Sequence, residues 1–331
     1  MTSEEDRCWE LAWNDPTVRL LKRFHYHNIE CLSELAGDKF YDMIRPMVLP
    51  SSMSASHIAR ETLGLQGNDL ETNARLVTFG NDYFAYATTR LVSYERAFVK
   101  RVDRCILQDG PPEACFHCRS GGVMECSSTN PEHQMVMTAT MPDGFRVCEY
   151  YITDRKHAIS GPKDYGKKMR DLPPNPVPPE QRVRFTREVL SWYMSFVMQA
   201  IIDNFGIDEY QNRMRHRLLY EGMRYAVIDA GKEGNASDLE KIVLGAMKVM
   251  GMSFKTRTEG GSSFITVSSC PFSCFPPYFC QMIETFFSGV CRWEGKDREI
   301  VQLLRITEGG SQTCQYVLRL KAYESVRWSD K

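Results

Sequence analysis

The sequence predicts an α+β protein made of two tandem copies of one module, each with N-terminal helices followed by a small antiparallel sheet. The first observation is a repeated ladder of four cysteines, with gaps of 10, 11 and 22 residues in the first half and 10, 11 and 23 in the second. The two ladders are Cys105, Cys115, Cys126 and Cys148, and Cys270, Cys280, Cys291 and Cys314. A repeated spacing of this length indicates an internal duplication.

The second observation is that each half ends in two expected strands joined by a glycine-containing turn. The expected strands are 134–141 and 145–152 in the first copy, and 300–306 and 313–320 in the second. A proline pair also recurs, since Pro111-Pro112 lies 165 residues before Pro276-Pro277. The offset equals that of the first three cysteine pairs, so the duplication extends beyond the cysteines.

The helices are clearest in the second copy, where apolar residues recur at helical spacing. The expected elements are helices over 213–230, 239–250 and 278–293 and a strand over 264–267. Asp238 stands where the N-cap of the second helix belongs, and Asp69 has the same place in the first copy. Pro277 suits the first turn of the third helix.

The duplication divides the chain into a first repeat with N-terminal helices at 1–160, a proline-rich linker at 161–182 and a second repeat at 183–331. The segment 173–179 contains five prolines and is expected to be stiff and extended. The most apolar stretch, 189–202, is too short to cross a bilayer and predicts a buried helix.

Charge and composition favour a cytoplasmic protein. With 41 basic and 42 acidic residues the net charge is −1, which argues against a nucleic-acid surface or a polybasic membrane anchor. The acidic N-terminus lacks the features of a signal peptide. We therefore expect the twelve cysteines to be reduced thiols, with no nucleic-acid or membrane partner.

The ladder cysteines are expected to be core residues. Cys280 and Cys291 lie three helical turns apart, close to one face of an apolar helix, and thiols commonly behave as small buried hydrophobes. The alternative is a zinc site in the first copy, where the segment 115–118 reads Cys-Phe-His-Cys and Cys126 and His133 follow. The second copy has Met282-Ile283 in place of the His-Cys pair, so such a site would belong to one half only.

Aromatic residues surround the second copy's cysteine helix and form either core or the wall of an apolar ligand pocket. The ligand-binding candidates are Phe272, Phe275, Tyr278, Phe279 and Phe286, beside Phe287. Three histidines of the N-terminal region, His25, His27 and His57, are expected to be polar surface residues.

Short motifs carry a family resemblance. In the second copy they are Ser269-Cys270-Pro271-Phe272, Pro277-Tyr278-Phe279-Cys280 and the closing segment 307–316. Over about 219–320 this copy resembles the 4-vinyl reductase domain family. The first copy, through 130–131 and 142–150, is similar to the related L-2-amino-thiazoline-4-carboxylic acid hydrolase family.

The vinyl reductase resemblance implies an α+β module that binds small aromatic or hydrophobic molecules, in some members with zinc held by Cys, Glu, Cys and Cys. The matching positions are Cys115, Met137, Thr140 and Cys148 in the first copy, and Cys280, Leu303, Ile306 and Cys314 in the second. Only two of four ligands are therefore present in each copy. Zinc would need a different set, Cys115, His117, Cys118 and Cys148.

The hydrolase resemblance implies a thiolate nucleophile or a general base. Cys105 and Cys270 are the candidate nucleophiles, because each is expected at a strand end near a helix start, where a thiol pKa is lowered. His117 or His133 could lie close to Cys105, and we take His117 as the candidate base.

These observations predict a cytoplasmic small-molecule-binding protein of the vinyl-reductase-like superfamily. One alternative is a cysteine-dependent hydrolase of a small C–N or C–S heterocycle or amide. The other is a non-catalytic assembly protein, because a duplicated chain can form a pseudo-two-fold interface, and a homodimer is possible.

Overall fold

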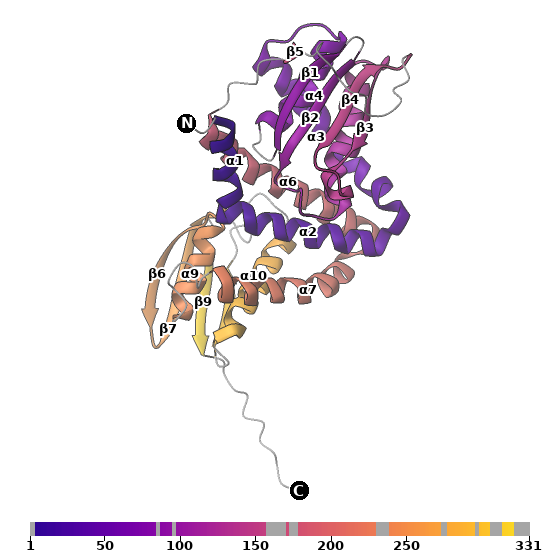
Figure 1. Cartoon of the computed structure of the whole chain (residues 1–331). Helices are drawn as coiled ribbons and strands as arrows, with labels where there is room; N and C mark the ends of the chain where they lie inside the picture. The colour runs from indigo at the N-terminus through magenta and orange to yellow at the C-terminus, as the bar shows by residue number, and fades with distance from the viewer. Residues whose placement is uncertain are drawn as a thin grey trace. The chain divides into compact units, whose positions relative to one another are not determined.

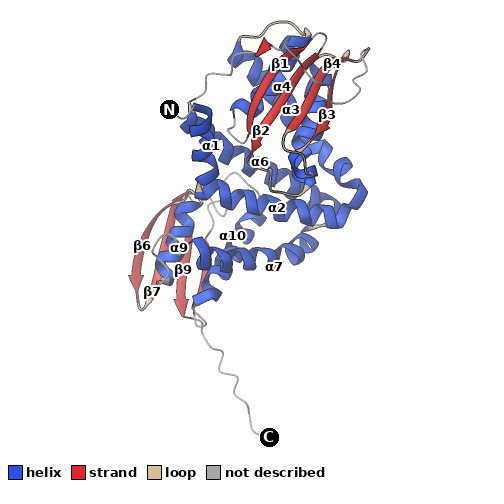
Figure 2. Cartoon of the chain, in the orientation of Figure 1, coloured by secondary structure: helices blue, strands red, loops and turns tan. Residues whose placement is uncertain are grey.

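The computed structural model describes residues 4–83, 87–94, 97–156, 170–171, 178–229, 238–272, 277–294, 298–304 and 313–320. The chain forms two compact units, unit 1 (Met1–Tyr210) and unit 2 (Gln211–Lys331). Each unit combines helices with a small antiparallel sheet, which confirms the α+β prediction (Figures 1 and 2). Among the described residues, no helix has the length and apolar character needed to span a bilayer.

Unit 1 contains a five-stranded antiparallel sheet in the order β3-β4-β2-β1-β5, with α4 packed on it (Figure 1). Its strands are β1 (Ala87–Tyr94), β2 (Ala97–Cys105), β3 (His133–Ala139), β4 (Cys148–Asp154) and β5 (Arg170–Asp171). Its α-helices are α1 (Glu4–Asn14), α2 (Pro16–Ala36), α3 (Phe40–Leu63), α4 (Leu70–Tyr83), α5 (Val123–Thr129) and α6 (Pro179–Phe205). Shorter helical segments are η1 (Gly37–Lys39), η2 (Pro112–Cys115), the π-helical η3 (His117–Gly122) and η4 (Met141–Asp143).

Unit 2 contains a four-stranded antiparallel sheet in the order β6-β7-β9-β8, and α10 packs against β8 and α9. Its strands are β6 (Ser253–Glu259), β7 (Ser262–Ser269), β8 (Arg298–Leu304) and β9 (Cys314–Leu320). Its helices are α9 (Leu239–Val249), α10 (Pro277–Glu294), most of α7 (Ile207–Arg224) and the π-helical η5 (Tyr225–Asp229) that continues α7.

The sheets repeat strand for strand, with β1 to β4 matching β6 to β9 in order and register. Irregular pairing falls between Thr88 and Thr89 in β1 and, 165 residues later, between Ser253 and Phe254 in β6. A second irregularity lies at residues 137–139 of β3 and recurs at 302–304 of β8. Bulges are specific local features of a strand pair, so their coincidence supports the duplication independently of the cysteines.

The helices repeat as well, because α3 and α7–η5 bury the same face. The buried positions are Phe40, Ile44, Val48, Ser52 and Ser56 in α3, and Tyr210, Met214, Leu218, Gly222 and Ala226 in α7–η5, each pair 170 residues apart. The predicted N-caps are present too. Asp69 accepts from the Thr72 backbone N–H at 2.9 Å, and Asp238 accepts from the Glu240 N–H at 3.0 Å.

Helix α6 corrects the expected domain boundary. The sequence places it in the second repeat, at 183–331, but it packs on α1, α2 and α3 within unit 1, and the units divide after Tyr210. The reason is its apolar face, where Val189, Leu190, Met194 and Val197 are buried. The segment 189–202 is thus a buried helix, as predicted. Most of the predicted linker lies outside the described residues.

The two units differ most in the helix that carries the second and third ladder cysteines. In unit 2 this helix is the continuous α10, whereas in unit 1 it is divided into η2, η3 and α5. Gly121-Gly122 in η3 aligns with Phe286-Phe287 in α10, and both phenylalanines are fully buried. Both units contain one π-helical segment, η3 and η5, but only in unit 1 does it interrupt the helix that carries the ladder cysteines.

Two glycines allow α7 and α10 to cross closely. A Cβ on Gly222 would lie 2.0 Å from the Phe286 carbonyl oxygen, and one on Gly289 would lie 2.2 Å from the Leu219 carbonyl oxygen. At the matching crossing in unit 1, a Cβ on Gly121 would lie 2.9 Å from Ser52 Oγ, which is a side-chain atom. The crossing in unit 2 is therefore the less tolerant of added volume.

We expect Gly222→Ala and Gly289→Ala each to destabilise the protein by about 3 kcal/mol or more, because the backbone of the facing helix must move. Gly121→Ala is the matched control and should cost less, since the three atoms it would approach, on Ser52, Val48 and His117, all belong to side chains and not to the backbone. Urea denaturation with separate probes for the two units measures this. Equal losses for all three variants would contradict the crossing geometry.

Candidate functional site

Three ladder cysteines and one tyrosine meet in each unit. In unit 1 the thiols of Cys105, Cys115 and Cys148 are close enough to interact electrostatically, and Tyr150 faces two of them. In unit 2, Tyr316 interacts in the same way with Cys314, Cys270 and Cys280. Each tyrosine lies two residues after the last ladder cysteine, on the same face of its strand. The ladder therefore marks one three-dimensional cluster that occurs twice.

Burial keeps the unit 1 thiols protonated. It raises the pKa of Cys105, and the Leu107 N–H, which donates to Cys105 Sγ at 3.4 Å, offsets this only in part. Burial and then the neighbouring thiols raise the pKa of Cys115. Burial also raises the pKa of Cys148 to about 11, against hydrogen bonds from the Met141 N–H and Tyr150. Buried thiols of this kind are poor nucleophiles at neutral pH.

Unit 1 adds a fourth thiol, Cys118 in η3, which is half-buried and in hydrogen-bonding contact with Tyr150. Burial and then Cys118 raise the pKa of Tyr150 well above its ordinary value. The aligned residue in unit 2 is Ile283, which is buried. The predicted divergence of the two halves at Cys118 therefore falls directly beside the cluster.

Lys100 is the buried cation of this region. It lies on β2 with only 2% of its surface exposed, donates from Nζ to the Val77 carbonyl oxygen at 3.3 Å, and stands over the Tyr150 ring at 5.1 Å. In unit 2 the aligned residue is Ile265, which pairs with Tyr316 as Lys100 pairs with Tyr150. One repeat thus has an ammonium group where the other has an aliphatic side chain.

Glu125 in α5 provides a buried carboxyl group near Lys100. Burial raises its pKa to about 8, while Lys100 and a hydrogen bond from Ser56 oppose the shift. Its aligned residue in unit 2 is the fully buried Val290. Both members of the Lys100–Glu125 pair are therefore replaced by aliphatic residues in the other repeat.

Two histidines of unit 1 are buried, His25 in α2 and His117 at the start of η3. Burial, and for His117 also Lys100, lowers the pKa of His25 and of His117 to about 3. The His117 ring lies 4.5 Å from the Tyr193 ring between centroids, and its Nδ1 has no hydrogen-bond partner among the residues that the structure describes. Within the described part of the chain, both ring nitrogens of His25 also lack a hydrogen-bond partner. The expectation that His25 is a surface residue is wrong, because its helix α2 is covered by α6 and η2.

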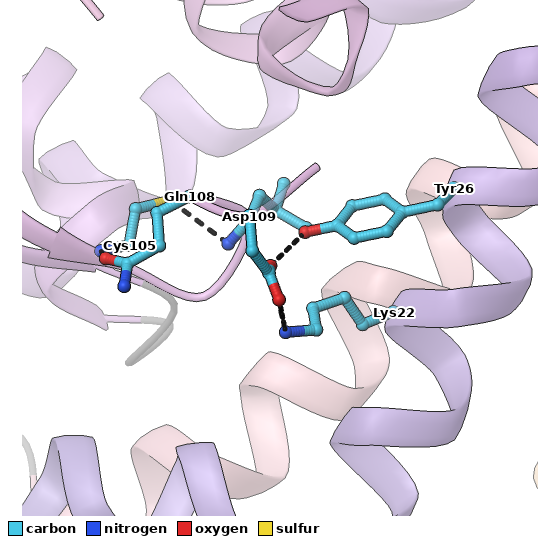
Figure 3. Close-up of polar contacts among 6 residues, drawn as sticks. Lys22, Tyr26, Cys105, Gln108 and Asp109 are labelled. Carbon is cyan, nitrogen blue, oxygen red and sulfur yellow. Dashed lines mark hydrogen bonds and ion pairs between the residues drawn. The ribbon is translucent and has the colours of Figure 1, made fainter. Parts of the chain in front are cut away.

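The loop after β2 holds Cys105 in place (Figure 3). The Cys105 backbone N–H donates to Gln108 Oε1 at 3.2 Å. Asp109 accepts from Lys22 Nζ at 2.9 Å and from the Tyr26 hydroxyl at 2.8 Å, which ties the loop to α2. These contacts fix the path of the loop that follows Cys105.

The predictions for the candidate catalytic residues differ in how they compare with the structure. Cys105 ends β2 and Cys270 follows β7, so both strand-end positions are confirmed. The lowered thiol pKa expected of Cys105 is wrong, because a turn follows β2, the next helix begins only at Pro112, and burial dominates. His117 interacts with Lys100 and Tyr193. His133 instead meets Asn73 at 3.1 Å, at the β3 edge.

No three His, Cys, Asp or Glu side chains within the described part of the chain are placed to hold one metal ion. The predicted zinc ligands Cys115, His117, Cys118 and Cys148 belong to this part. The His117 ring lies against the Tyr193 ring, whereas Cys118 contacts Tyr150, so these two neighbouring residues have different surroundings. Zinc stays a prediction.

The aromatic ligand-binding candidates of unit 2 pack against one another. Phe272 and Phe279 have ring centroids 4.9 Å apart, and Phe286 lies 5.6 Å from Phe287; all four are buried. Tyr278 is half-buried, and Phe275 lies outside the described residues. The described rings are core residues of unit 2, whichever further role they have.

Comparison with family models, curated proteins and solved structures gives no significant match. The resemblance to the vinyl reductase and thiazoline hydrolase families therefore rests on the short motifs alone. What can be compared directly is one repeat with the other.

Lys100 and Glu125 are the residues that the sequence reading misses. The signal that could have found them is the 165-residue offset itself, which aligns Lys100 with Ile265 and Glu125 with Val290 inside a buried strand and helix. A buried amino group and a buried carboxyl group, both replaced by aliphatic residues in the other repeat, mark a site where the two cores differ in polarity.

The buried titratable groups predict a stability maximum near pH 6.5. Between about pH 3 and 6.5, His25 and His117 are protonated in the unfolded chain but neutral in the folded protein. The free energy of unfolding therefore rises with pH over this range. Between pH 4.5 and 8 folded Glu125 retains a proton that the unfolded chain releases, so it lowers stability as pH rises. Above pH 6.5 only the Glu125 effect remains, about 2 kcal/mol up to pH 8.

Urea denaturation across pH 4 to 8 measures this profile. We expect Glu125→Val to remove most of the decline above pH 6.5, and His117→Met to reduce the slope below it. Both substitutions introduce the aligned residue of unit 2. Profiles that run parallel to that of the wild-type protein would contradict the proton assignment.

We also expect Cys105 and Cys115 to react with iodoacetamide at pH 8 at least about tenfold more slowly in the folded protein than after denaturation, because the thiolate is suppressed by burial. Mass spectrometry of the alkylated peptides gives the rates. Faster labelling of Cys105 in the folded state than in the unfolded state would instead support a reactive thiolate.

Proposed function

We propose that the chain is a small-molecule-binding protein whose working half is unit 1. The observation that carries this proposal is the polar core of unit 1, where Lys100, Glu125, His117 and Cys118 occupy positions that hold Ile265, Val290, Met282 and Ile283 in unit 2. The ligand meets these groups around η3. The motif resemblance, which implies small-molecule binding, points the same way.

The physical argument is the free-energy cost of a buried charge. Moving an ammonium group out of water costs several kcal/mol unless its surroundings compensate. Burying a carboxyl group that is protonated at neutral pH, as the raised pKa of Glu125 implies, also costs free energy unless it is hydrogen-bonded. Unit 2 demonstrates that the same fold accommodates the aliphatic pair. Retention of Lys100 and Glu125 therefore favours a role other than stability, since perturbed buried groups cluster at functional sites.

The polar groups also indicate the ligand's character. Neutral His117 and protonated Glu125 can each donate or accept a hydrogen bond, and Lys100 donates. The ligand we propose has an apolar or aromatic body and at least one acceptor group. Because the described cysteines are thiols, we place the protein in a reducing compartment, the cytoplasm.

The hydrolase alternative has less support. A Cys105 nucleophile needs a thiolate, and burial suppresses that form. Glu125 has a pKa of about 8 and can therefore act as a general acid near neutral pH. The pKa values thus favour a hydrolase that depends on Glu125 over one that depends on Cys105. If the chain is such an enzyme, Cys105→Ala retains turnover and Glu125→Gln abolishes it.

A thermal-shift screen tests the proposal. We expect at least one small compound with an acceptor group to raise the melting temperature of the wild-type protein by several degrees at saturation, because binding to the folded state alone stabilises it. The double variant Lys100→Ile/Glu125→Val should fold normally and lose that shift.

The matched control is Ile265→Val, a mild change at the aligned position of unit 2, which should keep the shift. A ligand shift of equal size in the double variant would place the binding site elsewhere. Loss of the shift in Ile265→Val as well would move the site to unit 2.

A further inference from the structure

Four thiols of unit 1 form one cluster around Cys118, which lies in η3. The other three, Cys105, Cys115 and Cys148, come from the end of β2, from η2 and from β4. Burial is the main cause of the raised pKa of each of these three, and among the neighbouring thiols Cys118 raises it most. The Tyr150 hydroxyl also hydrogen-bonds with both Cys118 and Cys148. Cys118 is therefore the thiol at the centre of the cluster.

Cys115 and Cys118 are three residues apart in a helical run. Cys115 ends η2, Phe116 has helical backbone angles of φ −53° and ψ −36°, and Cys118 is the second residue of η3. Three residues of helix place two Cα atoms about 5–6 Å apart, and disulfides join Cα atoms that are roughly 4.4–6.8 Å apart. The backbone thus already holds these two cysteines at a distance that a disulfide can bridge.

The two thiols differ in their access to solvent. Cys118 is half-buried, whereas Cys115 is only 7% exposed. Redox-sensitive thiol pairs commonly have this arrangement, because an accessible thiol meets the oxidant and a second thiol beside it reacts with the oxidised product. The pair therefore has the order of exposure that a two-step oxidation needs.

Unit 2 lacks this pair although it keeps the rest of the thiol cluster. Cys280 corresponds to Cys115, but the buried Ile283 takes the place of Cys118. The fold thus accommodates an aliphatic residue at this position, so packing alone does not call for a thiol there. Unit 2 also provides a reference in which a similar cluster lacks its central thiol.

We propose that Cys118 and Cys115 are a modification site, at which a hydroperoxide oxidises Cys118 and Cys115 then forms a disulfide with it. Cys118 first loses its proton to solvent, and the thiolate sulfur attacks one peroxide oxygen. The O–O bond breaks and Cys118 becomes a sulfenic acid. The departing oxygen takes up a proton and leaves as an alcohol, or as water when the oxidant is hydrogen peroxide.

Cys115 completes the reaction. Its sulfur attacks the sulfenic sulfur, the S–S bond forms as the S–O bond breaks, and the departing hydroxide takes the Cys115 proton and leaves as water. The two thiols together lose two electrons and two protons, which reduce the peroxide. Cys115 can act although it is buried, because its target lies on the adjacent turn and the step is intramolecular. The reaction involves no bound ligand, so it is independent of the proposed small-molecule binding.

Peptide mapping after treatment of the full chain with hydrogen peroxide tests the proposal, with the remaining thiols blocked by N-ethylmaleimide in urea before digestion. Trypsin leaves Cys105, Cys115 and Cys118 in the peptide 105–119, and Cys148 in the peptide 147–155. We expect the peptide 105–119 of the wild-type protein to carry one blocked thiol and one internal disulfide that dithiothreitol reverses. Cys314 of unit 2, in the peptide 306–319, is the control and should be fully blocked.

Three variants assign the disulfide. Cys118→Ile, which introduces the aligned residue of unit 2, should lower the yield of the disulfide at least about tenfold, because the first thiol to be oxidised is absent. Cys118→Ser should do the same, which separates loss of the thiol from any effect of isoleucine on packing. Cys105→Ala should keep the disulfide.

Other products would contradict the proposal. A disulfide within the peptide 105–119 that persists in both Cys118 variants would join Cys105 to Cys115 and overturn the role of Cys118. A link between the peptides 105–119 and 147–155 would overturn the pairing with Cys115. Complete blocking of every thiol, at a peroxide concentration that oxidises free cysteine, would overturn the whole proposal, as would a Cys118 sulfinic acid without a disulfide.

Discussion

The buried ammonium group of Lys100 is the constraint on which the account of this protein depends. A lysine that is 2% exposed on a sheet face must have its charge compensated by its surroundings. Here those surroundings include the Val77 carbonyl oxygen and the Tyr150 ring. Lys100 in turn opposes the rise in the pKa of the nearby Glu125 carboxyl group. The raised pKa of Glu125 and the lowered pKa of His117 follow from burial in the same region.

The internal duplication shows that the fold does not require a buried lysine at this position. Strand order, register and both strand irregularities are common to the two units, so the strand positions of unit 1 have defined counterparts in unit 2. The thiol and tyrosine clusters are retained in both, which is typical of core residues. Lys100 and Glu125 occur only in unit 1. The apolar core of unit 2 can therefore be compared position by position with the polar core of unit 1. We associate the polar residues that differ between the two cores with function.

Much of the fold is predictable from the sequence, because the cysteine ladder and the glycine turns fix the repeat, and α9, α10 and β9 follow from periodicity. The edge strand β6 is not, since nearly all of its residues are exposed and give no apolar pattern. The packing of α6 in unit 1 is also hidden, because an amphipathic helix does not specify which neighbour covers it. Lys100 and His25 look like surface residues in isolation; only tertiary burial changes their character.

The stability of the Lys100→Ile/Glu125→Val variant in the absence of any ligand tests the central claim most directly. If the polar core of unit 1 is kept for binding, then introducing the aliphatic pair of unit 2 should leave the free energy of unfolding unchanged or raise it by about 1–4 kcal/mol. Urea denaturation at pH 7 measures this difference. A loss of about 3 kcal/mol or more, with unit 1 unfolding first, would show that Lys100 and Glu125 are structural and would contradict the account.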